Sequence, residues 1–195
     1  MKVMHLLPSL SSGGVEQVVL ELCQGLCEQG VDCVVVSAGG AMVPAIEATG
    51  ARHITRPIGK KSLKTFMQVG KMVRLLKEEK PDILHLHSRV PAWVGYLACK
   101  RLKPSLRPHV ITTFHGFHSV NFYSAIMAKG DRVIAVSECM KEHILQHYPG
   151  KVQPEHISVI PNSVDTTQNY PEYRPSEEWL ETWRTAFPEL AGKYT

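Results

Sequence analysis

Short apolar runs alternate with amphipathic segments along the chain from Lys2 to Ile160. Each apolar run has the length of a β-strand, whereas the amphipathic segments repeat their apolar residues every three or four positions, which is typical of helices. The run Val31–Ser37 is apolar almost throughout, as expected of a strand buried on both faces of a parallel sheet. The predicted strands are Lys2–Leu7, Val31–Ser37, His53–Ile54, Ile83–His87, His109–Phe114, Arg132–Val136 and Ile157–Ile160.

The amphipathic segments predict helices between these strands. Ser137 and Glu138 are suited to the start of the last one, because serine caps a helix and an acidic residue in the first turn favours its dipole. The predicted helices are Val15–Gln29, Val43–Thr49, Ser62–Glu79, Pro91–Leu102 and Ser137–His147. The alternation predicts an α/β domain that is doubly wound, with a mostly parallel, Rossmann-like sheet.

The character of the sequence changes after Asp165. The segment Thr166–Pro175 is polar and contains tyrosine and proline, which predicts an extended linker. The segment Ser176–Phe187 is predicted to form a short helix. We therefore expect residues 1–165 to form one domain and residues 166–195 to form a linker with a short helix.

Composition and charge narrow the function classes without naming one. The chain of 195 residues is 44% hydrophobic and 21% charged, and its net charge of +4 suits an anionic substrate or a membrane surface but requires neither. The longest apolar stretches are strand-sized, and Met1–Pro8 lacks the long apolar region of a signal peptide. We expect a cytoplasmic protein that does not cross a bilayer. The five cysteines are scattered, which favours reduced thiols over disulfides or a metal site.

A glycine pair follows the first predicted strand. In a doubly wound sheet, ligands bind at the carboxyl ends of the strands, where the loop Ser11–Gly14 is expected to lie. Glycine allows close approach of a ligand, and the N–H groups at the helix start favour an anion such as a phosphate. The loop matches neither the G-x-G-x-x-G fingerprint nor a phosphate loop with its lysine, which argues against NAD and ATP.

Histidines stand at the end of one predicted strand, Ile83–His87. His85 and His87 alternate along it and point to the same face, which could supply two metal ligands, but no third ligand is evident. A packed His85 is the favoured interpretation. His87, which precedes Ser88 and Arg89, lies at the mouth of the strand and is the functional candidate.

His115 lies at the tip of another predicted strand, His109–Phe114. Gly116 follows at once and keeps the approach to the imidazole open. A histidine here can donate a hydrogen bond to a sugar hydroxyl or a phosphate oxygen. We predict that His115 is functional and that His118, in a loop rich in aromatic residues, is accessory.

Basic residues gather before and along the predicted helix Ser62–Glu79, beginning with Lys60, Lys61 and Lys64. The helix also carries an apolar stripe made of Leu63, Phe66, Val69, Met72, Val73 and Leu76. Two interpretations stay open. The helix either packs on the core with a solvated basic face, or docks peripherally on anionic lipid.

Five short motifs follow one another along residues 1–165. They are Ser12-Gly13-Gly14-Val15-Glu16, Pro81-Asp82-Ile83-Leu84-His85-Leu86-His87, Thr113-Phe114-His115-Gly116, Ile134-Ala135-Val136-Ser137-Glu138 and Val159-Ile160-Pro161-Asn162-Ser163-Val164-Asp165. With these motifs the chain resembles the N-terminal, acceptor-side domain of GT-B-fold glycosyltransferases of family 4, retaining enzymes that use nucleotide-diphosphate sugars. The last motif of the family usually reads Pro-Asn-Gly-Val-Asp, and Ser163 replaces its glycine here.

The resemblance implies a role for particular residues. It makes His115 the catalytic residue, which approaches the transferred sugar. The residues implied in binding the donor's phosphates and sugar are Ser12, Gly13, Gly14, Ser137 and Glu138. Those implied in binding the acceptor are Glu16, His87, Arg89, Gly116, His118 and Asn121. The nucleotide-diphosphate sugar is a co-substrate, and no metal or other cofactor is implied.

The resemblance also implies partners. The acceptor is expected to be a lipid-linked or cell-envelope glycan, with peripheral contact to the inner face of the membrane through Lys60, Lys61 and Lys64 and no binding of nucleic acid. Enzymes of the family hold the nucleotide mainly in a second α/β domain, through a pair of glutamates. We expect that C-terminal donor domain to be absent from these 195 residues and the isolated chain to be inactive.

Three alternatives are weighed against a transferase. A nucleotide-sugar epimerase of the same fold predicts a paired acidic residue in the cleft and no acceptor groove. A non-catalytic module that recognises a glycan or a partner predicts a gene without the glutamate pair. A Rossmann dehydrogenase is disfavoured because the glycine fingerprint is missing.

Overall fold

The computed structural model of the protein describes residues 1–163 and 174–190. The chain divides into two compact units, Met1–Asn162 and Ser163–Thr195, and each is described by itself. Part of the predicted turn Pro161–Asp165, most of the predicted linker Thr166–Pro175 and residues 191–195 lie outside the described residues.

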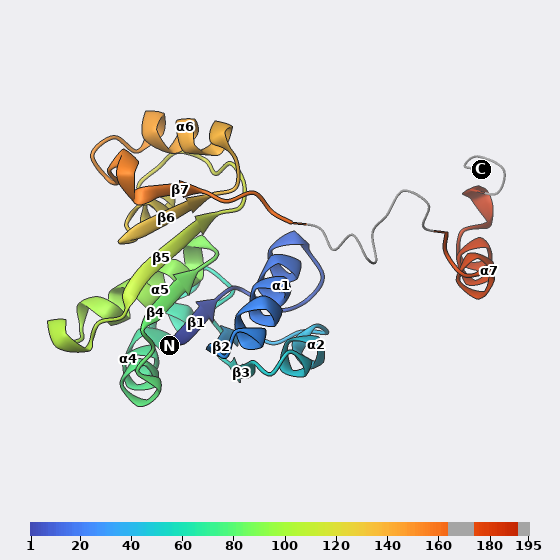
Figure 1. Ribbon diagram of the computed structural model, residues 1–195, viewed down its shortest axis with the longest axis horizontal. Helices are drawn as coiled ribbons and strands as arrows, with labels where there is room; N and C mark the ends of the chain where they lie inside the picture. The colour runs from blue at the N-terminus through green and yellow to red at the C-terminus, as the bar shows by residue number, and fades with distance from the viewer. Residues whose placement is uncertain (164–173, 191–195) are drawn as a thin grey trace. The chain divides into compact units, whose positions relative to one another are not determined.

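Seven parallel strands form one sheet in the first unit, in the order β3-β2-β1-β4-β5-β6-β7 (Figure 1). The strands are β1 (Lys2–Leu6), β2 (Asp32–Ser37), β3 (Arg52–Thr55), β4 (Ile83–Leu86), β5 (His109–Phe114), β6 (Arg132–Ala135) and β7 (Ile157–Val159). The predicted doubly wound, Rossmann-like fold is confirmed. The order reverses between β1 and β4, and this reversal is the place where doubly wound sheets bind their ligands.

Helices connect the strands of the first unit. They are α1 (Gly14–Glu28), α2 (Val43–Ala48), α3 (Leu63–Phe66), α4 (Gln68–Glu79), α5 (Arg89–Lys100) and α6 (Glu138–His147), with short 3₁₀ helices η1 (Pro104–Leu106), η2 (Ser124–Ala128) and η3 (Pro154–His156). Ser137 caps α6 as predicted, because its Oγ accepts a hydrogen bond from the backbone N–H of Met140 at 3.1 Å. The pattern did not predict η2.

Each face of the sheet has its own core, because successive side chains of a strand point to opposite faces. On one face, the even-numbered residues of β1 and β4 pack with apolar residues of α4, α5, η2 and α6. On the other face, α1 and α2 pack over β2 and over the loop that follows β1. Gly95 lets α5 approach closely, since a Cβ there would lie 2.9 Å from a methyl carbon of Leu86.

The prediction of one continuous, packed helix over Ser62–Glu79 is wrong. The segment forms two helices, α3 and α4, separated by Met67. The buried stripe begins only at Val69, whereas Leu63 is 86% exposed and Phe66 41%. Spacing alone could not reveal this difference, since the apolar residues continue through both segments at helical intervals.

The second unit contains α7 (Glu177–Ala186) and the 3₁₀ helix η4 (Pro188–Leu190). Ser176 caps α7 by accepting a hydrogen bond from the N–H of Trp179 at 3.2 Å. The helix lies within the predicted Ser176–Phe187. Among the described residues of both units, no helix has the length and apolarity needed to span a membrane.

Candidate active site at the carboxyl edge of the sheet

The loop after β1 leads into α1 at the point where the strand order reverses. Gly13 is the extended residue before the helix, and no side chain caps the first N–H groups. Ser12, Gly13 and Gly14 are all exposed. Uncapped N–H groups and the positive end of the helix dipole form a site that favours an anion. The loop therefore leaves the first N–H groups of α1 without a side-chain cap, and its binding of a phosphate stays a prediction.

The loop after β2 fixes the backbone of this glycine loop. The N–H of Leu10 donates to the carbonyl of Gly39 at 2.8 Å, and the N–H of Met42 donates to the carbonyl of Leu10 at 2.8 Å. Gly40 has a φ of +146°, and a Cβ there would overlap the backbone of Leu10. Glycine at this position therefore allows the two loops to lie against each other.

Glu16 lies in the first turn of α1 and turns back over the loop. A Cβ on Gly13 would lie 2.6 Å from a carboxylate oxygen of Glu16. The carboxylate thus occupies space beside the helix start, where its negative charge is favourable. An anion that binds at the same point has to displace it.

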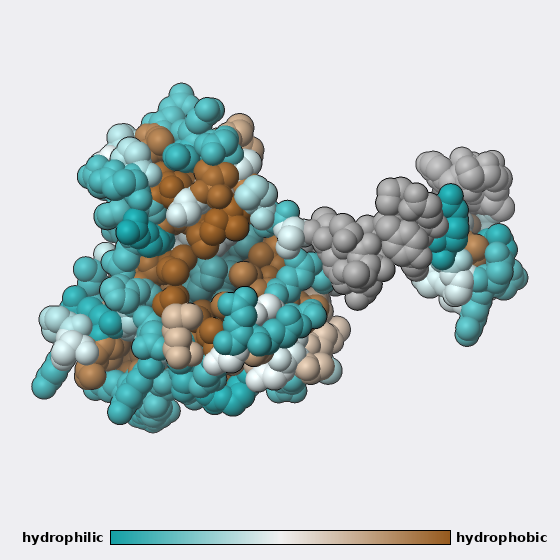
Figure 2. Space-filling view, in the orientation of Figure 1, coloured by the Kyte–Doolittle hydropathy of each residue, from teal (hydrophilic) through white to brown (hydrophobic). Residues whose placement is uncertain are grey.

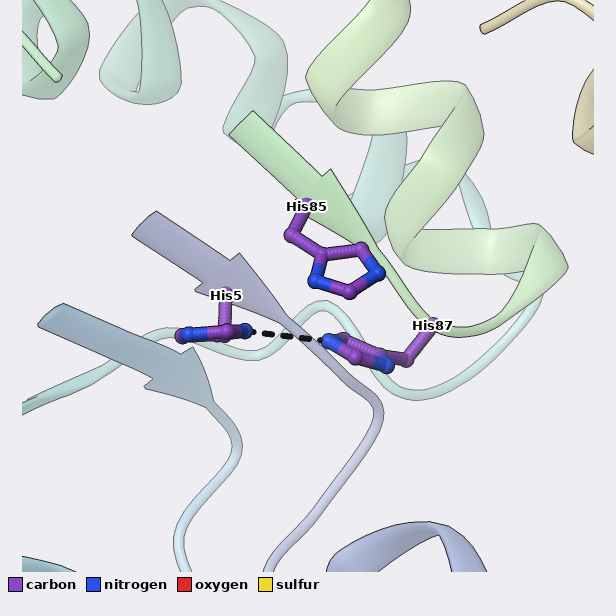
Figure 3. Close-up of side chains that lie close together, drawn as sticks. All are labelled: His5, His85 and His87. Carbon is purple, nitrogen blue, oxygen red and sulfur yellow. Dashed lines mark hydrogen bonds between the residues drawn. The ribbon is translucent and has the colours of Figure 1, made fainter. Parts of the chain in front are cut away.

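A chain of histidine side chains crosses the ends of three strands. Nδ1 of His5, on β1, is 3.1 Å from Nε2 of His87 (Figure 3), and Nδ1 of His87 is 3.1 Å from Nε2 of His115. His5 and His87 are buried, whereas His115 is half-buried. These hydrogen-bonded histidines connect the interior of the sheet to the tip of β5.

Burial keeps the imidazoles of His85, His87 and His115 uncharged at neutral pH. It lowers the pKa of His85 and His87 well below 6.5, and neighbouring histidines lower both further. The pKa of His115 falls to about 4, mainly through burial and then through the charge of His118. A neutral imidazole has one donor and one acceptor nitrogen, so His115 is suited to hydrogen bonding rather than to ion pairing.

Arg89 and Asn121 meet at Ser124, at the start of η2. Nη1 of Arg89 donates to Oγ of Ser124 at 3.2 Å, and Oδ1 of Asn121 accepts from the N–H of Ser124 at 2.9 Å. The guanidinium also lies 5.6 Å from the ring centre of Tyr123. Two predicted acceptor residues are therefore brought together, although both already have partners within the chain.

His118 packs against β5 beside this group. Its ring centre lies 6.0 Å from that of Phe114. Its pKa is lowered by burial and then by the charge of Arg89. The third predicted acceptor residue is thus electrostatically coupled to the first, and all three are held close to the end of β5.

Lys61 connects this group to the exposed helix α3. Its Nζ lies 4.7 Å from the ring centre of Tyr123. Figure 2 shows one face of the first unit, which carries hydrophobic residues between α1 and α6 with hydrophilic residues around them. A mostly apolar surface with a few convergent polar groups is typical of ligand sites.

Ser137 and Glu138 lie at the end of β6 and are exposed. The hydroxyl of Ser137 is used in capping α6, and Glu138 adds a negative charge to that helix start. The geometry therefore differs from the uncapped start of α1. Their part in donor binding stays a prediction, as do the contacts of Glu16, His87 and Gly116 with an acceptor.

His5 is the site residue that the sequence did not single out. Its place in the site depends on the strand order, because β1 and β4 pair in register with His5 beside His85. In a doubly wound sheet the first strand lies next to the strand that follows the crossover, so this pairing could have been inferred. Ser124 also had no signal, since its role depends on the unpredicted helix η2.

A parallel Rossmann-like sheet with an uncapped helix start at the strand-order reversal, and histidines at the ends of the next two strands, is the arrangement of one half of a GT-B fold. The family model described as Glycosyltransferase Family 4 matches residues 12–168. The chain belongs to this family. No curated protein sequence matches it.

Solved structures show the same half-domain. The chain is 30% identical to a glycosyltransferase from Rickettsia africae ESF-5, with a TM-score of 0.73 over 96% of this chain and 49% of that one. It is 21% identical to Anabaena HepE in complex with UDP and glucose (TM-score 0.68, 96% and 50%). The lipopolysaccharide outer core galactosyltransferase WaaB is 19% identical (TM-score 0.67, 91% and 49%).

The chain therefore spans about half the length of the glycosyltransferases it matches. UDP-GlcNAc 2-epimerases are also among the solved structures with this fold. The fold alone does not separate transfer from epimerisation, whereas the family match does favour transfer.

Proposed function

We propose that the chain is the acceptor-side half of an enzyme that transfers a sugar from a nucleotide-diphosphate sugar to a lipid-linked or cell-envelope glycan, with retention of anomeric configuration. The observation that carries the proposal is the position of His115. It directly follows β5, bonds to His87 directly after β4, and shares its sheet edge with the uncapped start of α1. The UDP and glucose bound by HepE and the lipopolysaccharide substrate of WaaB support the two substrate classes.

The glycine loop is the proposed site of the diphosphate. The N–H groups that follow Gly13 donate to phosphate oxygens, and the helix dipole stabilises the charge that develops on the leaving group. These groups and basic side chains perform the neutralisation, so the proposed reaction requires no metal. Ser137 and Glu138 are proposed to bind hydroxyls of the donor sugar.

His115 is proposed to bind the transferred sugar. Its Nδ1 is buried and has no hydrogen-bond partner among the described residues. A sugar hydroxyl or phosphate oxygen that reaches this nitrogen satisfies it. Because the imidazole is neutral, it stabilises the reacting group through one directed hydrogen bond.

The acceptor is proposed to approach from the side of Arg89 and Lys61. The two cations lie on one tyrosine, Tyr123, and attract a phosphate-bearing carrier. His118, Asn121, Glu16 and Gly116 are the further proposed contacts. A lipid-linked acceptor suits the surface around Arg89 and Lys61, because the neighbouring helix α3 exposes apolar side chains.

Helix α3 is proposed to touch the membrane that holds such an acceptor. Leu63 is 86% exposed and Met67 is 73% exposed, so these side chains are not part of the core. They lie among the basic residues Lys60, Lys61 and Lys64. Exposed apolar residues flanked by lysines suit the interface of an anionic bilayer, which supports the proposed peripheral position of the enzyme on the inner face.

The 195-residue chain by itself is proposed to be inactive. Its described first unit provides one sheet edge, and the proposal assigns the nucleotide to a second domain. The chain, mixed with labelled nucleotide sugars and a lipid-linked acceptor, is expected to give no glycoside. Product formation by the chain alone would contradict this part of the proposal.

The role of His115 is tested in the complete gene product. His115→Ala is expected to reduce turnover at least about 100-fold, the usual effect of removing a group that stabilises the reacting centre. His109→Ala is the matched control, because His109 begins the same strand at its opposite end and is exposed. Equal activity of the two variants would refute the role of His115.

A further inference from the structure

Three buried imidazoles meet over the central strands of the sheet. His5 and His85 are register partners on β1 and β4, and His87 follows on the same face. One ligand atom of each residue lies within 4.8 Å of those of the other two. Figure 3 shows the three rings turned toward one another, with Nε2 of His87 beside Nδ1 of His5.

The spacing of these nitrogens is close to that of metal ligands. Nδ1 of His5 and Nε2 of His87 are 3.1 Å apart. Two nitrogens bound to one tetrahedral Zn²⁺ at roughly 2.0–2.1 Å lie roughly 3.3–3.4 Å from each other. Two of the three ligands therefore have nearly the required spacing, and the ligand atom of His85 lies within 4.8 Å of both.

The outer nitrogens of His85 and His87 have the partners that metal-bound histidines need, whereas Nε2 of His5 is buried without a partner among the described residues. Nε2 of His85 is 2.7 Å from Oγ1 of Thr113, which leaves Nδ1 for an ion. Nδ1 of His87 is 3.1 Å from Nε2 of His115, which leaves Nε2 for the ion. Such hydrogen bonds orient a ligating imidazole and fix which nitrogen carries the proton.

We propose that His5, His85 and His87 bind one transition-metal ion, and that the ion is Zn²⁺. The ligands are three imidazoles without a carboxylate, a set that suits zinc and its neighbours rather than Mg²⁺ or Ca²⁺. Three protein ligands leave one tetrahedral position for a water molecule or another small ligand. The site is separate from the diphosphate-binding loop and goes beyond the proposed transfer, which uses no metal.

Two other groups of ligands compete for the same ion. His143 and His147 are one turn apart on α6, with ring centres 4.5 Å apart, and form a surface pair. His5 also lies within 4.8 Å of the thiols of Cys23 and Cys33. The histidine triad is preferred because two of its three members have oriented outer nitrogens, and the experiment separates all three groups.

The 195-residue chain is expressed with Zn²⁺ in the medium and freed of weakly held metal with a mild chelator. Native mass spectrometry then measures the number of Zn²⁺ ions bound to each chain. One Zn²⁺ per chain is expected. Replacement by Co²⁺ is expected to give the visible bands of a four-coordinate nitrogen site without a thiolate charge-transfer band. His85→Phe is expected to abolish both signals, and Thr113→Val to weaken Zn²⁺ binding about 10–100-fold while all three ligands remain.

The controls are His143→Ala/His147→Ala and Cys23→Ser, which are expected to retain one Zn²⁺ per chain. Thr113→Val keeps the proposal testable if His85→Phe does not fold. Absence of bound metal in the wild-type chain would overturn the proposal. So would loss of the metal in either control, unchanged affinity in Thr113→Val, or a thiolate band with Co²⁺. None of these results bears on sugar transfer, which is tested through His115.

Discussion

His87 and His115 are hydrogen-bonded side chain to side chain across the ends of neighbouring strands, with Nδ1 of His87 3.1 Å from Nε2 of His115. The pairing of β4 with β5 brings the two residues together. Because His87 is 3% exposed, its ring is fixed by the core and can hold the more exposed His115 in one orientation. We therefore regard His87 as a positioning residue for His115.

Removal of this hydrogen bond should slow the reaction without weakening donor binding. His87→Phe keeps an aromatic ring but cannot bond to His115, so kcat of the complete gene product is expected to fall about tenfold, the effect of one neutral hydrogen bond. His53→Phe removes a comparable bond, to Ser37 on the far side of β1, and should leave kcat unchanged. An unchanged kcat in His87→Phe, with a raised KM, would indicate direct substrate contact instead.

The packing of α5 on the sheet depends on Gly95. A Cβ there would lie 2.9–3.2 Å from methyl carbons of three buried leucines, Leu86, Leu6 and Leu84. Gly95→Ala is therefore expected to lower the free energy of unfolding by about 1–2 kcal/mol. Gly70→Ala, in the exposed interior of α4 with no atom near its Cβ, should raise it by about 0.5–1 kcal/mol. Urea unfolding of both variants measures the two changes in the free energy of unfolding, which should have opposite signs. Changes of the same sign would contradict the close packing of α5 at Gly95.

Glu79 makes stability depend on pH at the amino edge of the sheet. Arg52 and Lys2 bond its carboxylate, at 2.6 and 3.1 Å, and lower its pKa from 4.5 to about 2. A lowered pKa stabilises the fold above pH 4.5, and this contribution is lost as the pH falls toward 2. Because Arg52 is half exposed, solvent screening limits the contribution to about 1–2 kcal/mol.

The comparison is made with Glu79→Gln. Its free energy of unfolding should lie below that of the wild type by this amount at pH 6 and should approach the wild-type value near pH 2. A difference that does not change with pH would mean that the carboxylate charge is not the cause.

Charge reversal near α3 should release the chain from anionic vesicles. Each basic residue near such a surface contributes about 1 kcal/mol, so Lys60→Glu/Lys61→Glu is expected to weaken binding at least roughly 30-fold in co-sedimentation. Lys77→Glu/Lys103→Glu changes the net charge equally at exposed positions away from α3. Equal loss in both double variants would indicate a general charge effect, and no binding by the wild type would remove the membrane proposal.

The sequence predicted the sheet well because its strands are short, apolar and buried. Val34, Val36, Leu84 and Leu86 belong to runs that have no other stable position than the centre of an α/β domain. The ends of the elements follow local signals too, such as Ser137 at the start of α6 and Pro81 after α4. His87 and His115 could be placed on one edge for the same reason.

The parts that escaped prediction depend on non-local contacts. His5 is one polar residue in an apolar run, and only the pairing of β1 with β4 places it beside His85 and His87. Leu63 continues the helical spacing of the buried stripe, yet its side chain is 86% exposed. Periodicity reports which residues share a face of a helix, but not whether anything covers that face.

The most direct measurement of the central claim follows the product of the complete gene product by NMR. A nucleotide-diphosphate sugar and a lipid-linked glycan acceptor are mixed with the enzyme, and the anomeric signals are recorded over time. We predict a new glycoside on the acceptor with the anomeric configuration of the donor, and almost none with His115→Ala. An epimerised nucleotide sugar with an unmodified acceptor, or a glycoside of inverted configuration, would contradict the account.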